Sequence, residues 1–477
     1  MKKIVVCTLL GFIGFSAFAQ KKYNLQEALS LAMEHNISIR QSMLDAEAAE
    51  LDKLDATGNF IPSVNLQGSN TWNTGLTQNV TTGVLQTQTV RNFSANATAS
   101  LTLFDGLRNF KQAQRAKLST LAAQYSLEKM KDDIALMVAN NYLTILQNKA
   151  NLEILNTQHL VTEQQIDQTK ELVDGGELPR ADLLEAQAQY ASEEQQIVAA
   201  ENAVQISLIG LAQMLSIKDY KNFDIVDDDY QLAGEEMLLK NPQEIVDAAK
   251  QERYEIQIAE KNMEIAQKDL ELSRGAYYPT LSAFINYNTR ESGQGQYISG
   301  GIDPDQPTQQ IGVVETTGDA VVAPNTIVAL SNPRPFFEQL YLNDGITYGF
   351  QLNIPLLNGF AARNQVKRSK VNALRAEYNL EQAQLDLESN VYQAYLDAQG
   401  ALKSYQAAQA AIESTKLASE YAQIRYEEGL SNAFEYNQVK QRYDNALLDL
   451  NRTKYDYIFK LKVLELYFGI PITELKF

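Results

Sequence analysis

Residues whose types and spacing could do chemistry are few in this sequence. The two histidines, His35 and His159, each lack a second histidine three or four residues away, so surface or packing roles are expected rather than metal binding. Gly293-x-Gly295 and Gly300-Gly301 complete neither a dinucleotide-binding nor a phosphate-binding motif and open no helix, which indicates loops. Carboxylates are abundant, but no nucleophile is paired with a base. We therefore expect no enzymatic activity, metal or cofactor.

Acidic residues occur in two settings of interest. Asp224 and the run Asp227-Asp228-Asp229 lie in the segment 216–241, and the run lacks the spaced ligands of a calcium loop, so a solvated linker is expected. Asp182 and Glu435 each lie just beyond a glycine turn. In a three-fold assembly an inward-facing acid at such a turn forms a ring, which attracts cations, repels anions and raises its own pKa values.

The composition excludes several classes of protein. The 477 residues are 45% hydrophobic and 21% charged, with a formal net charge of −18. Such a chain contains too many hydrophobic residues to be intrinsically disordered, and too many polar residues to be a helical membrane protein. Beyond the N-terminal leader no run approaches the ~18 apolar residues of a transmembrane helix. The acidic balance argues against a nucleic-acid partner, because phosphate would be repelled.

The N-terminus reads as a secretory signal peptide over residues 1–19. Met1-Lys2-Lys3 is basic, an apolar stretch follows, and Ala17-Phe18-Ala19 matches a cleavage site. The alternative is a buried N-terminal strand or anchor. The single cysteine, Cys7, lies inside the apolar stretch, so lipid attachment there is not expected. A mature chain without cysteine excludes disulfides, thiolate catalysis and cysteine-bound zinc.

Glycine and proline are unevenly distributed and mark out long helices. The tract 107–174 contains neither residue, and 360–428 contains only Gly400. A helix of that length extends about 100 Å, far beyond an ordinary globular helix, which predicts coiled-coil-like rods. Shorter helices are predicted over 24–57, 181–215, 242–275 and 431–468.

The sequence contains an internal repeat, over residues 20–230 and 231–477. Landmark residues recur at a constant spacing of 253 positions: Gly106/Gly359, Tyr125/Tyr378, Tyr142/Tyr395, Gly176/Gly429 and Tyr190/Tyr443. Earlier landmarks recur at a spacing of 217: Glu27/Glu244, Ala32/Ala249, Ile39/Ile256, Ala49/Ala266 and Pro62/Pro279. The difference between the two spacings predicts an insertion between Pro279 and Gly359. A duplication of this length predicts that the fold consists of two copies of one structural unit.

Each repeat also contains a predicted β-hairpin, over 60–104 and 277–357. Apolar and polar residues alternate there, as in transmembrane β-strands, although ordinary hairpins with one buried face fit the same pattern. The polar side, expected to line a pore, comprises Ser94, Asn96, Thr98, Ser100, Thr347, Gln351 and Asn353. Four strands cannot close a barrel and open edges are forbidden in lipid, so several chains must share one, and a trimer would supply twelve strands. The polar segments 73–92 and 291–343 are predicted as loops outside the cell.

Taken in order, these features resemble the TolC family of outer-membrane efflux proteins. The resemblance covers nearly all of the mature chain and includes local motifs at the strand and helix ends: Phe60-Ile61-Pro62, Tyr277-Tyr278-Pro279, Leu103-Phe104-Asp105-Gly106, Leu356-Leu357-Asn358-Gly359, Gly176-Glu177-Leu178-Pro179-Arg180-Ala181-Asp182 and Gly429-Leu430-Ser431-Asn432-Ala433-Phe434-Glu435. It implies a mainly α fold with a small β part. Three chains would form a 12-stranded barrel in the outer membrane of a Gram-negative bacterium, continued by a periplasmic α-helical barrel.

The resemblance also implies a function and partners. The channel would be the passive exit duct of a tripartite efflux or type I secretion system. It would receive substrates from a periplasmic adaptor (a membrane fusion protein) and an inner-membrane pump of RND, ABC or MFS type. The helical tip turns expected to meet the adaptor contain Gly175, Gly176, Gly429 and Leu430. The alternative is a secreted coiled-coil scaffold or adhesin without a pore.

By the same resemblance, residues near the tip turns form a gate at the periplasmic entrance. In the family a tyrosine bonds to an acid of the first turn, and acids near the second turn line the entrance; the matching residues here are Tyr426, Asp182 and Glu435. The chain departs from the family at Gln438, which is not an acid, and at Ser431, which is not arginine. The contacts that hold the gate closed are therefore expected to be weaker, or to use Arg180 or Arg425 instead. Ordinary surface roles for all of these residues remain the alternative.

Overall fold

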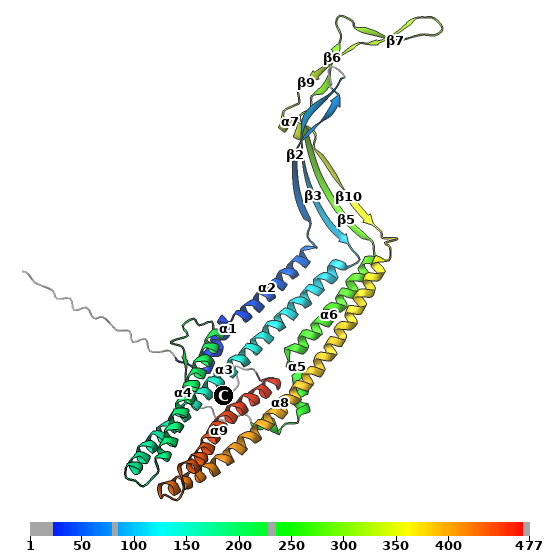
Figure 1. Cartoon of the computed structure of the whole chain (residues 1–477). Helices are drawn as coiled ribbons and strands as arrows, with labels where there is room; N and C mark the ends of the chain where they lie inside the picture. Colours follow the sequence, from blue (N-terminus) through cyan, green and yellow to red (C-terminus); the bar gives the residue numbers. More distant parts are fainter. Residues whose placement is uncertain (1–21, 79–83, 228–234, 471–477) are drawn as a thin grey trace, which may run out of the picture. The chain divides into compact units, whose positions relative to one another are not determined.

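The computed structural model describes residues 22–78, 84–227 and 235–470 (Figure 1). Contacts divide the chain into two compact units. The helical unit lies within Met1–Leu51, Lys117–Ala266 and Val371–Phe477. The sheet unit lies within Asp52–Ala116 and Gln267–Lys370.

The two repeats form the same helices. In the first repeat the helices are α1 (Leu25–His35), α2 (Ile37–Gly58), α3 (Arg108–Asp174) and α4 (Arg180–Met214). In the second they are α5 (Pro242–Glu252), α6 (Tyr254–Arg274), α8 (Ala361–Glu427) and α9 (Ala433–Tyr467), with the short 3-10 helix η1 (Glu235–Leu239) before them and η2 (Gly275–Tyr277) after α6. Every long helix in one repeat starts at the residue equivalent to its counterpart in the other, so the duplication extends to the helix ends.

Two of the four shorter predicted helices are each broken by one residue, which corrects the continuous helices predicted over 24–57 and 242–275. Asn36 separates α1 from α2 and Arg253 separates α5 from α6, each with an extended ψ near 130°. The Asn36 side chain accepts a hydrogen bond from the Ser38 backbone and donates one to the Met214 carbonyl. Arg253 instead pairs with Asp132 and Glu255. A single extended residue leaves the apolar period intact, which is why the break was not predicted.

The core of the helical unit is also built twice. In the second repeat, a buried cluster joins α5, α6, α8 and α9: Ile245, Val246, Ala249, Ile256, Leu387, Val391, Ala398 and Leu464. Each of these residues has its repeat equivalent in the larger buried cluster of the first repeat: Ala28, Leu29, Ala32, Ile39, Ile134, Val138, Ile145 and Leu211. The larger cluster also contains Tyr455, Ile458 and Leu466 of α9, so the two repeats share one helix at their junction.

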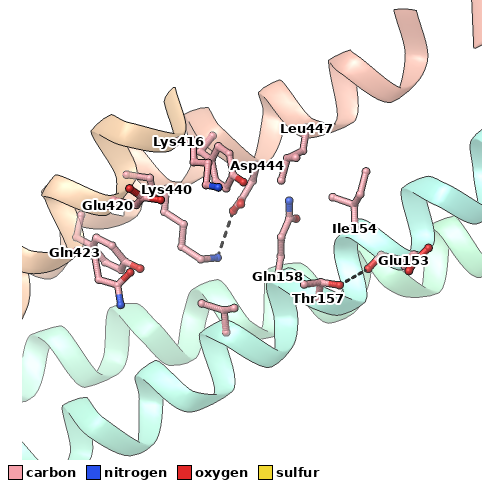
Figure 2. Close-up of a pocket in the computed structure, with 14 residues that line it drawn as sticks. Glu153, Ile154, Thr157, Gln158, Lys416, Glu420, Gln423, Lys440, Asp444 and Leu447 are labelled. Carbon is pink, nitrogen blue, oxygen red and sulfur yellow. Dashed lines mark hydrogen bonds and ion pairs between the residues drawn. The ribbon is translucent and has the colours of Figure 1, made fainter. Parts of the chain in front are cut away.

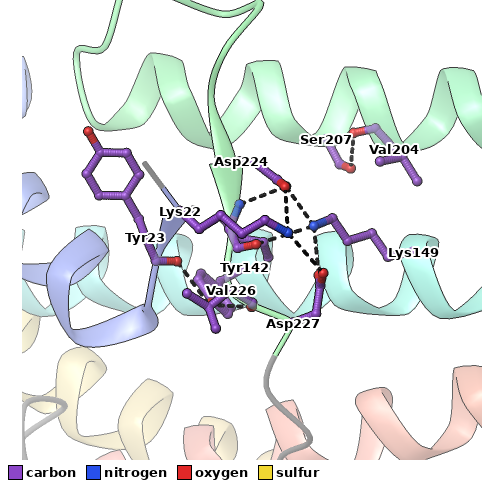
Figure 3. Close-up of polar contacts among 10 residues, drawn as sticks. Lys22, Tyr23, Tyr142, Lys149, Val204, Ser207, Asp224, Val226 and Asp227 are labelled. Atoms are coloured by element: carbon purple, nitrogen blue, oxygen red, sulfur yellow. Dashed lines mark hydrogen bonds and ion pairs between the residues drawn. The ribbon is translucent and has the colours of Figure 1, made fainter. Parts of the chain in front are cut away.

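The segments that join the repeats are held against α3 by polar contacts (Figure 3). β1 (Lys22–Tyr23) pairs in parallel with β4 (Asp224–Ile225). The Tyr142 hydroxyl lies 3.2 Å from the Tyr23 carbonyl and 2.9 Å from the Val226 carbonyl. Its repeat equivalent, Tyr395, donates to the Leu238 carbonyl at 3.0 Å. Equivalent tyrosines therefore anchor the connecting segment in both repeats.

Two of the aspartates predicted as solvated are ion-paired. Lys149 lies 2.6 Å from Asp224 and 2.7 Å from Asp227, and Lys22 lies 3.0 Å from Asp224. Burial alone would raise the pKa of the Asp224 carboxyl, but hydrogen bonds from Lys149 and Lys22 outweigh burial and hold that pKa below its ordinary value. The other two aspartates of the run, Asp228 and Asp229, lie outside the described residues.

The sheet unit contains one four-stranded antiparallel sheet in the order β10-β5-β3-β2. Its strands are β2 (Ser63–Gln78), β3 (Leu85–Phe104), β5 (Thr280–Ser292) and β10 (Gly345–Asn353). β2 and β3 include most of the predicted loop 73–92, because polar side chains pair across the strands there; Thr74 and Thr89, for example, share a hydrogen bond of 2.8 Å. The described part of the predicted loop is therefore mostly strand, and residues 79–83 of that prediction lie outside the described residues.

The predicted loop 291–343 also forms regular structure. β6 (Gln296–Ile302) pairs with β9 (Thr326–Ser331), and β7 (Thr308–Val313) pairs with β8 (Ala320–Pro324). Helix α7 (Phe336–Leu342) then precedes β10. Gly300 and Gly301 lie in β6 rather than in a loop. The prolines of this segment favoured a loop: Pro304, Pro307, Pro324, Pro333 and Pro335.

One described helix, α4, is long and apolar enough by hydropathy to cross a membrane. α4 is not a continuous apolar run, because Glu193, Glu194 and Glu201 lie within it. Val204, Leu208, Leu211 and Ala212 of α4 nevertheless belong to the larger buried cluster. One side of α4 therefore packs in the helical unit, although only 22% of its apolar window is buried.

Removing the tyrosine hydroxyls tests the anchoring of the connecting segments. Tyr142→Phe leaves the Val226 carbonyl without its donor, whereas the Tyr23 carbonyl still accepts from the Val226 amide, so we expect the free energy of unfolding to fall by about 1–3 kcal/mol. Tyr395→Phe should have a similar effect. The measurement is urea denaturation of the detergent-solubilised protein, with Tyr378→Phe, an exposed tyrosine on α8, as the control. Unchanged stability in both variants would contradict the anchoring role.

Candidate functional site

The candidate site lies where the long helices turn back. α3 ends in a turn at Gly176 (φ +78°) and α8 in a turn at Gly429 (φ +68°), a backbone region that favours glycine. The Glu177 amide donates to the Leu172 carbonyl at 2.8 Å, and the Leu430 amide donates to the Arg425 carbonyl at 2.7 Å. The returning helix α9 is capped by Asn432, which accepts from the Glu435 amide. These turns fix the backbone positions from which the side chains of the tips project.

A tyrosine pair joins the two tips. Tyr426 stacks on Tyr436 with ring centroids 5.4 Å apart, and both pack with Ala433 and Leu178. The Tyr426 hydroxyl shares a 3.1 Å hydrogen bond with Thr169 of α3. The structure therefore gives Tyr426 a threonine partner in place of the Asp182 expected from the family resemblance. A buried hydroxyl needs one good partner, and Thr169, only 1% exposed, supplies it.

Electrostatics still couple the tyrosines to nearby acids. Burial raises the pKa of the Tyr426 phenol, the Thr169 hydrogen bond opposes this, and the charge of Asp182 raises it further. Burial, with the charges of Asp444 and Glu427, raises the pKa of Tyr436 to about 12. Both phenols are therefore protonated at neutral pH.

The other predicted gate residues lie at the surface of the isolated chain. Asp182 is half-buried, whereas Arg180, Glu435 and Gln438 are exposed. Arg425 reaches the Leu430 carbonyl at 3.4 Å, within its own turn. Neither arginine forms an ion pair with Asp182 among the described residues. The chain thus presents Asp182 and Glu435 without a cation of their own, as the ring hypothesis requires.

A buried charge cluster lies beyond the tyrosine pair. Lys440 of α9 is 3.2 Å from both Glu193 of α4 and Asp444, and donates to Thr162 of α3 at 3.1 Å. Gln189 and Thr162 also donate to the same Glu193 oxygen. Glu193 is only 3% exposed and Lys440 6%. Three helices are therefore joined through one desolvated ion pair.

The surroundings of this cluster are partly open. His159 stacks on Tyr190, and its Nδ1 lies 3.8 Å from Glu193 Oε2; neither atom has a hydrogen-bond partner among the described residues. Burial raises the pKa of the Asp444 carboxyl, although Lys440 opposes the effect. Figure 2 shows Lys440 and Asp444 on the wall of a cavity of about 420 Å³ between α3, α8 and α9.

Sequence reasoning missed this cluster, although the repeat contains a signal for it. The equivalents of Lys440 and Glu193 in the other repeat are Gln187 and Ala446, both uncharged. Lys440 and Glu193 thus place opposite charges at buried positions whose equivalents in the other repeat are neutral. Comparing the repeats for charge as well as for landmarks would have identified the pair.

The predicted polar strand positions share one face of the sheet. Thr98 lies opposite Asn65 of β2 and Asn286 of β5, and Gln351 lies opposite Ser282. Because paired residues project to the same side, this face carries Ser94, Asn96, Thr98, Ser100, Thr347, Gln351 and Asn353 together. Phe284 interrupts the polar face, and Gly349 opposite leaves room for its ring.

The arrangement combines acids at the tips with a polar strand face. No group of three or more His, Cys, Asp or Glu side chains is placed to hold a metal ion within the part of the chain described. His35 contacts Arg40, and His159 lies in the cluster around Glu193.

Comparison with known proteins gives a consistent assignment. The chain matches the family described as "Outer membrane efflux protein" over residues 28–216 and again over 245–469. It is 22% identical to "Outer membrane protein TolC" of Vibrio cholerae over 361 residues, 75% of this chain and 70% of that protein. It is also 22% identical to "Proteases secretion protein PrtF" of Dickeya chrysanthemi, over 81% of this chain and 73% of that one.

Solved structures share the fold at lower identity. The CmeC outer membrane channel of Campylobacter jejuni has a TM-score of 0.73 and 16% identity, covering 94% of this chain and 85% of that one. The outer membrane protein VceC of Vibrio cholerae has a TM-score of 0.71 and 14% identity, covering 93% and 96%. The same topology thus recurs over nearly the full length of these chains.

The buried ion pair gives a direct test of how the tips are held. Lys440→Met leaves the Glu193 carboxylate buried without its cation, so we expect a loss of about 3–5 kcal/mol in the free energy of unfolding. Adding Glu193→Gln to Lys440→Met should recover much of that loss. Chemical denaturation measures both, and Lys403→Met, at an exposed lysine on α8, is the control. A loss no larger than the control's would show that the pair is not structural.

Proposed function

The chain belongs to the family of outer membrane efflux proteins, and from that premise we propose that three copies assemble into one exit duct across the outer membrane. The observation that carries the proposal is the four-stranded sheet, which is polar on one face and apolar on the other. Its outer strands, β2 and β10, each have one edge without a partner strand among the described residues. Twelve strands from three chains would close such a sheet around a polar lumen.

Exposed apolar side chains on the helices support the same assembly. They occur along α2, α4 and α8, on the sides away from the buried clusters: Met43, Leu44, Leu54, Val198, Ile206, Leu374, Leu385, Leu396, Leu417 and Ile424. A helix of 67 residues with such a stripe needs a neighbour to cover it. Neighbouring copies of the chain would bury these residues. A scaffold without a pore would have no use for the polar strand face.

The partners we propose are a periplasmic adaptor and an inner-membrane pump. The relatives include one protein named for protease secretion, so we propose both efflux and type I secretion as uses of the same duct. The tip turns with Gly175, Gly176, Gly429 and Leu430 are exposed and would meet the adaptor.

The tips would act as the entrance gate. In a trimer Asp182 and Glu435 each become a ring of three carboxylates, which favours cations in the entrance. The contact of Tyr426 with Thr169 would hold the two tips of one chain together, while Asp182 remains available to line the entrance. The gate would therefore depend on the acid rings more than on a tyrosine–acid bond.

Planar-bilayer recordings test the gate. Asp182→Ala and Glu435→Gln remove the carboxylates that draw cations into the entrance, so we expect the cation preference to fall and the single-channel conductance in potassium chloride to fall about two-fold. Glu413→Gln, at an exposed acid within α8, is the control. Unchanged conductance and selectivity in both ring variants would rule out the gate while leaving the duct itself in place.

The internal repeat predicts how neighbouring copies pair. β3 meets β5 with Thr98 opposite Asn286, and these residues correspond in the repeat to Gln351 and Ser69. The two hairpins share one register, since Asn65 pairs with Thr98 and Ser282 with Gln351. Gln351 of one chain should therefore lie opposite Ser69 of the next, with side chains about 5 Å apart.

Cysteine cross-linking tests this register. A chain carrying Ser69→Cys and Gln351→Cys should oxidise to covalent dimers and trimers on a denaturing gel. Asn65→Cys with Gln351→Cys, displaced by about 13 Å along the strand, should remain monomeric. Cross-linking of the second pair alone would show a different register, and cross-linking of neither would contradict closure through these edges.

A further inference from the structure

Helix α7 is fastened to the end of the sheet remote from η2. The Gln339 side chain donates to the Ser292 carbonyl and accepts from the Ser292 amide, both at 3.1 Å. The Asn343 side chain donates to the Arg290 carbonyl at 3.0 Å, and Thr289 donates to the Leu340 carbonyl. These contacts hold α7 against the last four residues of β5.

The polarity of α7 is inverted relative to a helix that packs on a sheet in water. Its polar Gln339 is buried against β5, whereas Phe337 and Tyr341, one turn apart, are each 81% exposed. Leu342 beside them is also exposed. A buried glutamine beneath an outward aromatic pair indicates that the outward side faces something apolar.

The contacts also show which face of the sheet α7 covers. Phe336 packs edge-on against Phe93 with ring centroids 5.1 Å apart, and the Arg91 guanidinium lies 5.6 Å from the Phe336 centroid. Phe93 lies opposite Glu291, and Arg91 opposite Trp72. These residues project to the apolar face, together with Ala95, Ala97, Leu66, Ile285, Tyr348 and Phe350. α7 therefore sits on the side opposite the polar strand positions.

Spacing along the strands places α7 one membrane thickness from another set of aromatic residues. Tyr278 and Phe60 are exposed at the strand starts, and Thr289 and Trp72 follow them by eleven and twelve residues respectively. Strands tilted by about 40° rise about 2.5 Å per residue along the membrane normal, so about ten residues cross the ~25 Å apolar band of a transmembrane barrel. α7 thus begins where that band ends.

We propose that α7 is a membrane-surface anchor, whose outward side formed by Phe337, Tyr341 and Leu342 inserts at the boundary between lipid headgroups and acyl chains. The inference rests on the proposed insertion of the sheet in the membrane and adds a lipid contact outside the strands. The proposal is supported by the position of α7, which continues the apolar face of the sheet at the level where aromatic side chains favour the membrane interface.

A second copy of the chain is a less suitable occupant of this surface. α7 packs over β3 and β5, the two central strands, whereas neighbouring copies would add at β2 and β10. The Arg91–Glu291 ion pair, 2.7 Å long with Glu291 buried, joins those central strands, and its Arg91 lies over the Phe336 ring at the start of α7. The outward aromatic pair would thus face lipid in a closed barrel.

Tryptophan fluorescence tests the proposal, because Trp72 is the single tryptophan of the chain. In a Trp72→Phe background, three reporters are introduced separately: Phe337→Trp on α7, Tyr348→Trp in the middle of the apolar strand face, and Ile311→Trp on β7. Each full-length protein is reconstituted in phosphatidylcholine vesicles brominated either near the headgroup or deep in the acyl chain, with iodide as the aqueous quencher.

We expect Phe337→Trp to lose about half of its fluorescence in the shallow-brominated vesicles and less in the deep ones, as an interfacial residue should. Tyr348→Trp should respond to the deep bromines, and Ile311→Trp only to iodide. If Tyr348→Trp is quenched by lipid and Phe337→Trp is not, the anchor is wrong and the membrane-inserted sheet stands, whether or not iodide reaches Phe337→Trp. If Tyr348→Trp is not quenched by either lipid, membrane insertion of the sheet fails and the anchor fails with it.

Discussion

Backbone groups at a sheet edge cannot stay unpaired inside a lipid bilayer, because no water is present to replace the missing partner. The sheet of this chain has two such edges, on β2 and β10, and four strands are too few to close on themselves. This constraint makes the isolated chain incomplete. It also accounts for the exposed apolar stripes on the helices, which would be a liability in a monomer and are a requirement in a shared barrel.

The duplication supplies symmetry, and the tips depart from it. Core positions, helix ends and strand registers repeat closely between the halves, as Tyr142 and Tyr395 show by anchoring equivalent connecting segments. At some positions near the tips the two repeats differ. Lys440 and Glu193 correspond to the neutral residues Gln187 and Ala446 in the other repeat, and Tyr426 corresponds to Val173. Residues that break the repeat are the ones that join the two tips. The contacts between the two tips therefore depend on positions where the copies have diverged.

The sequence predicted the fold class, the long helices and the duplication because each depends on a periodic signal extending over dozens of residues. Single-residue events escaped prediction. Asn36 interrupts a helix without disturbing the apolar period, and Thr74 pairs with Thr89 in a segment too polar to be recognised as strand. The polar strand face followed from a period of two. The partner of Tyr426 did not, since Thr169 lies 257 residues away and only packing brings the two together.

The shared register of the two hairpins has a consequence for stoichiometry. An edge formed by β10 meets an edge formed by β2 in the same way in every copy, so the pairing rule would be satisfied equally by rings of two, three or four chains. Nothing in the pairing of the strands fixes the number of chains in the ring. The number of copies must be set by the angle at which the long helices pack against their neighbours, far along the chain from the pairing that closes the ring. Substitutions on the outer helical stripes should therefore be able to change the diameter of the pore without altering a single residue that lines it.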